Sequence, residues 1–68
     1  MLPNTTFTFT EEPSERKNTI KVIINVDDDS AIDQDVLTYI QTQSAYKERV
    51  LIKLHESERG VWIAYFRS

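Results

Sequence analysis

Several residue types that stabilise or equip small proteins are missing or scarce in this chain of 68 residues. It has no cysteine, which excludes a disulfide framework and a cysteine-based zinc site. Its single glycine excludes a glycine-rich phosphate-binding loop. Its single histidine, His55, has no partner motif for catalysis or metal binding, and we expect it to lie on the surface. We therefore expect a protein that is not an enzyme and that binds no cofactor and no metal.

Long apolar runs are also missing. The longest, Val61 to Phe66, has six residues, whereas a membrane-spanning helix needs roughly 20. Met1 to Thr10 has neither the basic start nor the apolar stretch of a secretory signal peptide. We therefore expect a cytoplasmic protein that makes no membrane contact.

An excess of basic residues is absent too, because the net charge is −3. Residues 27–35 contain five aspartates and no base, while residues 45–68 contain five bases and three acids. Proteins that bind nucleic acids in general usually carry a basic excess. DNA binding would therefore need a small basic face, doubled in a dimer, and the acidity suits a protein partner equally well.

The apolar content, 40% of the residues, is typical of a globular protein, and the length allows one domain over residues 1–68. A lone domain of this size buries only roughly 60% of its unfolded surface. Because no disulfide or metal site stabilises it, we expect a homodimer.

Two segments show the period-two alternation of a β-strand. In Thr19–Val26 every second residue from Ile20 onward is apolar and β-branched, so the segment is predicted as a strand. Thr5 to Thr10 alternates threonine with Phe7 and Phe9, and is predicted either as a further strand or as a disordered arm.

A helix is predicted over residues 30–42. Ile32, Val36 and Ile40 recur at helical spacing, and polar residues occupy the opposite side. The acidic run Asp27–Asp28–Asp29, followed by Ser30, supplies N-capping residues.

Residues 45–68 allow two interpretations, which lead to two folds. In the first, Ser44 caps a second helix in which Tyr46, Val50 and Leu54 form one apolar stripe that ends at Gly60. In the second, Val50–Leu54 and Val61–Phe66 form a hairpin, with Val50, Ile52 and Leu54 buried together. Short apolar runs cannot be assigned by periodicity alone.

The first interpretation resembles the ribbon-helix-helix family of small DNA-binding dimers, which includes repressors, plasmid-partition proteins and antitoxins. The resemblance covers Arg16 to about Glu58, with TIKVIINV as the ribbon and SAIDQDVLTYI and SAYKERVLIKL as the helices. It implies an intertwined β-α-α homodimer with an N-terminal arm over residues 1–16, a core over 17–58 and an aromatic segment over 59–68. In that family the ribbons of two chains pair and enter the DNA major groove.

Carried over to this chain, the resemblance assigns operator or centromere-like DNA as the target. The residues expected to contact bases are Thr19, Lys21 and Asn25. Those expected to contact phosphates are Arg16, Lys17, Ser44 and Ala45.

The second interpretation is a ββαββ domain in which a four-stranded antiparallel sheet carries one helix on one face. Its strands are predicted over 5–10, 19–26, 49–55 and 61–66. The expected function is then protein binding, as a phage or plasmid accessory or inhibitor protein. The partner would contact the aromatic C-terminal segment through Trp62, Tyr65 and Phe66.

Overall fold

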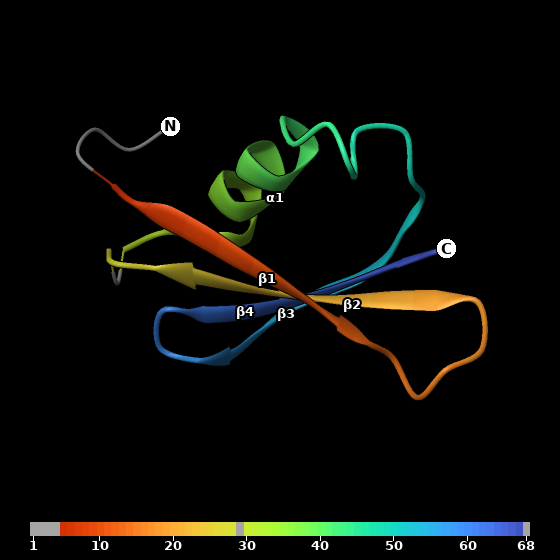
Figure 1. The fold of residues 1–68 in the computed structure, drawn as a ribbon. Helices are drawn as coiled ribbons and strands as arrows, with labels where there is room; N and C mark the ends of the chain where they lie inside the picture. Colours follow the sequence, from red (N-terminus) through yellow and green to blue (C-terminus); the bar gives the residue numbers. More distant parts are fainter. Residues whose placement is uncertain (1–4, 29, 68) are drawn as a thin grey trace.

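The fold is a four-stranded antiparallel sheet with one helix, seen in a computed structural model that describes residues 5–28 and 30–67 (Figure 1). The elements are β1 (Phe7–Pro13), β2 (Thr19–Val26), α1 (Asp33–Gln41), β3 (Leu51–Glu58) and β4 (Val61–Arg67). The strand order is β1-β2-β4-β3, and α1 lies over one face of the sheet. No helix in the described ranges is long and apolar enough to cross a membrane.

The ribbon-helix-helix prediction is wrong, and the ββαββ alternative is the correct one. Residues 42–49 form turns, and the segment expected to be the second helix continues into strand β3. A turn at Arg59 and Gly60, where Gly60 has φ +79°, then reverses the chain into β4. Glycine adopts this left-handed conformation without a steric penalty, which favours a hairpin at this point.

Strand β2 lies inside the sheet and is paired along both edges. Ile24 is opposite Phe9 of β1 on one side and opposite Trp62 of β4 on the other. A ribbon-helix-helix dimer needs this strand to pair with its copy in a second chain. Because both of its edges are occupied, β2 cannot serve as that ribbon.

The core lies between the sheet and α1, and it uses the alternation predicted for β2. Val22 and Ile24 are fully buried, whereas Ile23 between them is only half-buried. The buried apolar residues are Val22, Ile24, Val26, Ala31, Val36, Ile40, Tyr46, Trp62, Ala64 and Phe66. A single small core thus draws on β2, β4, α1 and the turns on either side of the helix.

The helix begins three residues later than predicted, at Asp33. The Ile32 N–H donates to the Asp35 carboxylate over 3.0 Å at the N-terminus of α1. Ser30 does not cap the helix, because its N–H and hydroxyl both donate to Asp28 Oδ1, over 2.9 and 2.6 Å. These two bonds lower the pKa of the Asp28 carboxyl. Asp29 of the predicted acidic cap lies outside the described residues.

Strand β3 contains two register shifts, and they change which side chains reach the core. One lies between Leu51 and Lys53 and the other between Glu56 and Glu58. As a result Leu51 and Leu54 both pack against the core, while Ile52 is 44% exposed. The expectation that Val50, Ile52 and Leu54 share a buried face is therefore wrong for Val50 and Ile52.

Candidate functional site

The face of the sheet opposite α1 is the candidate site, and we call it the open face. Within the described ranges, no helix or strand covers it. Strand pairing arranges its side chains in rows across the four strands. Its residues are Thr8, Thr10, Glu12, Thr19, Lys21, Ile23, Asn25, Lys53, His55, Glu58, Val61, Ile63, Tyr65 and Arg67.

The centre of the open face is apolar. Ile23 of β2 and Ile63 of β4 are directly opposite each other, and each is half-buried. Val61, also half-buried, continues this surface along β4. A half-exposed aliphatic pair on two central strands offers a partner a contact that would remove apolar surface from water.

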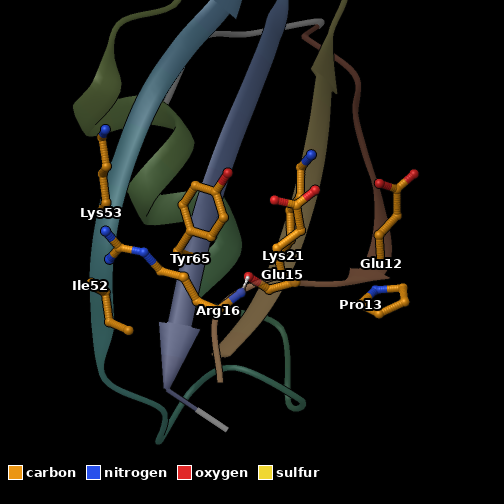
Figure 2. Close-up of a pocket in the computed structure, with 9 residues that line it drawn as sticks. Glu12, Pro13, Glu15, Arg16, Lys21, Ile52, Lys53 and Tyr65 are labelled. Carbon is orange, nitrogen blue, oxygen red and sulfur yellow. Dashed lines mark hydrogen bonds between the residues drawn. The ribbon is translucent and has the colours of Figure 1, made fainter. Parts of the chain in front are cut away.

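One end of the open face forms a groove of about 570 Å³ beneath the loop that joins β1 to β2 (Figure 2). Tyr65 lies in its centre, with Lys21 on the neighbouring strand β2 and Lys53 on the neighbouring strand β3. Arg16 extends from the loop across β4 toward Lys53. The groove is lined by Glu12, Pro13, Ser14, Glu15, Arg16, Lys21, Ile52, Lys53 and Tyr65.

The cations of this groove form no ion pair within the described residues, although Glu12 lies directly opposite Lys21 and Glu15 lines the same groove. Neither a side-chain hydrogen bond nor an ion pair joins Arg16, Lys21 or Lys53 to any part of the chain that the structure describes. The Arg16 backbone N–H donates to Ser14 Oγ over 3.1 Å, which leaves the guanidinium uninvolved. Their donors are therefore free to bind an anionic group that enters the groove.

His55 lies beside the groove and is more buried than predicted. Its ring is stacked near that of Tyr65, with 6.4 Å between centroids and 21° between planes. Its Nδ1 atom is buried and makes no hydrogen bond within the described residues. No group of three or more potential metal ligands forms anywhere in those same residues, so the geometry gives His55 no metal-binding partners.

The residues predicted to contact DNA bases do lie together, although not for the reason expected. Thr19, Lys21 and Asn25 all project from β2 onto the open face. Arg16 and Lys17 lie in the adjoining loop, outside any strand. The phosphate site expected at Ser44 and Ala45 has no structural basis, because both residues lie in turns after α1 and no second helix begins there.

The aromatic segment is divided between the two faces of the sheet. Trp62 and Phe66 point toward α1 and are 7% and 1% exposed, so neither can meet a partner without unfolding. Tyr65 alone of the three lies on the open face. The sequence reasoning missed Ile63, His55 and Lys53, although period-two alternation along β4 could have placed Ile63 beside Tyr65.

The chemistry offered by this face is recognition of a surface that carries both apolar and negatively charged groups. Arg16 can bind a carboxylate through two parallel hydrogen bonds, and each lysine can contribute further donors. Comparison of the chain with protein-family models, with curated proteins and with solved structures finds no match.

Proposed function

We propose that this protein is a non-enzymatic protein-binding module and that its open face binds a partner segment carrying apolar side chains and carboxylates. One observation carries the proposal: three cations that form no ion pair within the described residues surround Tyr65 at the end of a half-exposed aliphatic strip. The strip would take the apolar side chains of the partner, and the groove would take its carboxylates.

The energetic argument combines the two halves of the face. Contact with Ile23 and Ile63 removes apolar surface from water, which contributes roughly 25 cal/mol for each Å² buried. Charge pairing with Arg16, Lys21 and Lys53 adds orientation and increases the association rate more than it adds affinity. A partner with only one of the two features would therefore bind weakly or without a fixed register.

Two observations favour a protein over a nucleic acid as the partner. Glu12 and Glu15 line the same groove as the cations, and they would repel a continuous row of phosphates. Bound single strands are usually held by stacking on several exposed aromatic rings, and Tyr65 is the only such ring of β4 on this face. A carboxylate-bearing segment can place its charges at the cations and apolar groups elsewhere.

The proposal is tested by amide NMR of the labelled protein with three probes of equal length. The first is a short peptide alternating glutamate and valine, the second replaces glutamate by lysine, and the third is oligothymidylate. We expect the acidic peptide to shift the amide signals of Lys21, Ile23, Ile63 and Tyr65, and the lysine peptide to leave them unchanged.

Charge-reversal variants show whether the groove is responsible. Lys21→Glu should weaken binding of the acidic peptide by at least about tenfold. Lys47→Glu makes the same change in net charge on an exposed turn after α1 and should leave binding intact. No shift with the acidic peptide would overturn the proposal, and shifts caused by oligothymidylate alone would replace it with nucleic-acid binding.

A further inference from the structure

The sheet has two edge strands, and they differ in how well they are protected against pairing with another chain. Strand β3 has two register shifts and carries Lys53, Glu56 and Glu58. Bulges and charges are the usual means by which proteins block an exposed edge. Strand β1 pairs with β2 without any shift over seven residues, and its charges, Glu11 and Glu12, lie at one end, beyond the uncharged residues 7–10.

The backbone groups that β1 leaves unpaired can be identified from its pairing with β2. The Asp27 N–H donates to the Thr6 carbonyl over 3.3 Å, so the even-numbered residues of this strand bond toward β2. Because bonding alternates along an antiparallel pair, the N–H and C=O groups of Phe7, Phe9 and Glu11 point outward. No other strand in the described residues lies next to them.

We propose that β1 pairs in antiparallel orientation with β1 of a second copy of this chain, with Phe9 at the two-fold axis. Phe9 would exchange both backbone hydrogen bonds with the partner's Phe9, and Phe7 would do so with the partner's Glu11. The product is a continuous eight-stranded sheet that keeps both helices on one side and both open faces on the other. This association uses an edge, and it is independent of the function proposed for the open face.

This register is favoured because it pairs every outward-pointing N–H group of the strand. It pairs all three of Phe7, Phe9 and Glu11 and leaves Pro13, which has no N–H, outside the ladder. Glu11 lies opposite an aromatic ring and Glu12 opposite Thr6, so no like charges meet. A shift that centres the pairing on Thr10 would place Phe7 opposite Pro13 and lose a donor.

The side chains around the axis support the same arrangement. Phe9 is 36% exposed on the helix side, where its ring lies 5.6 Å from that of Tyr46 and 6.3 Å from that of Tyr39. Two Phe9 rings brought together at the axis would extend this aromatic cluster across the dimer. On the open side, Thr8 would lie directly opposite the partner's Thr10, and threonine pairs of this kind stabilise sheets.

Two double variants of exposed residues test the interface and its register. In Thr8→Lys/Thr10→Lys like charges would oppose each other across the axis, whereas in Thr8→Lys/Thr10→Glu opposite charges would. Both threonines are exposed and face neutral residues of β2, so circular dichroism should show both variants folded.

Sedimentation equilibrium of the full chain provides the measurement. We expect the wild type to dimerise to twice its mass of 8.0 kDa. The doubly basic variant should raise the dimer dissociation constant by at least about tenfold, and the mixed-charge variant should restore or tighten the dimer. A wild type that remains monomeric at millimolar concentration would overturn the proposal, as would two double variants with equal dissociation constants.

Discussion

The two faces of the sheet are built from alternate residues of the same strands, yet they differ sharply in burial. On the helix side, Val22, Ile24 and Ala64 have no exposed surface. On the open side, Ile23 and Ile63 are the most apolar neighbours and remain half-buried. Neighbouring positions of one strand therefore contribute separately to the core and to the open face.

Strand alternation lets a chain of this size build a core on one face of the sheet and leave the other face uncovered. Each residue of β2 and β4 is assigned to one face by strand alternation alone. A substitution of a residue that faces α1 should therefore reduce the stability of the fold. A substitution of a residue on the open face should mainly change the proposed binding. The following four predictions test this division, beginning with the largest expected effect.

The difference in stability between substitutions on the two faces should be largest at Phe66 and Tyr65. These residues are adjacent in β4 and point to opposite faces. Phe66→Ala removes a ring that is 1% exposed and stacks at 5.1 Å on Tyr46, and it should lower the free energy of unfolding by about 3–5 kcal/mol. Tyr65→Ala should lower it by about 1 kcal/mol. Urea denaturation followed by circular dichroism measures both, and equal losses would show that the open face is covered in solution.

In β3 the register shift, and not simple alternation, determines which side chains face the core. Leu54→Asp places a charge against the core and should destabilise the fold by about 2–3 kcal/mol. Ile52→Asp lies two residues away at a 44% exposed position and should change stability by less than about 0.5 kcal/mol. Thermal melting compares them, and a large loss for Ile52→Asp would place that residue in the core.

The turn at Gly60 sets the register in which β4 enters the sheet. Replacing this glycine should therefore disturb the core and the open face together. A side chain at Gly60 would require the φ of +79° and would bring its Cβ to 2.8 Å from the Val26 carbonyl oxygen. Gly60→Val should therefore lower stability by about 1–3 kcal/mol. Asparagine adopts a positive φ more readily than valine, but its Cβ would lie equally close to the Val26 carbonyl oxygen. The melting temperature of Gly60→Asn should therefore lie between those of Gly60→Val and the wild type.

The smallest effect on stability is expected at Tyr46, a titratable residue in the core between the sheet and α1. Burial, followed by its hydrogen bond of 2.7 Å to Glu11, raises the pKa of Tyr46 to about 12. Because this value exceeds the ordinary tyrosine pKa near 10, the protonated Tyr46 hydroxyl stabilises the folded protein. This stabilisation is fully present below pH 10 and is lost as the pH rises toward 12.

Tyr46→Phe isolates this contribution. It should cost about 1 kcal/mol at neutral pH by removing the hydrogen bond, and it should flatten the alkaline loss of stability. Unfolding titrations at a series of pH values measure the slope. An unchanged slope in the variant would assign the alkaline loss to other groups.

The sequence predicted most of the elements but favoured the wrong one of the two folds, and the reason lies in β3. The register shift at Ile52 adds a residue, so the core-facing Leu51 and Leu54 lie three positions apart. That spacing is typical of a helix face. The predicted stripe of Tyr46, Val50 and Leu54 does not form one face, because Tyr46 reaches the core from a turn and Val50 is 57% exposed. The regular β2, by contrast, was predicted correctly.

The candidate site was harder to predict because it depends on contacts between distant segments. Lys21 and Tyr65 are neighbours only because β2 pairs with β4, and this pairing leaves no local signal in the sequence. Arg16 reaches the same groove from the loop after β1. The resemblance predicts Lys21 and Arg16 as DNA contacts and does not connect them with Tyr65.

The position of β4 in the sheet also governs when the fold can form during synthesis. This strand lies in the interior of the sheet, yet it is the last of the five elements to leave the ribosome. Until it emerges, β2 has one open edge, and the core lacks Trp62, Ala64 and Phe66. Pairing between segments so far apart in sequence is intrinsically slow. The nascent chain therefore passes through an interval in which β2 is exposed to aggregation or to capture by a chaperone.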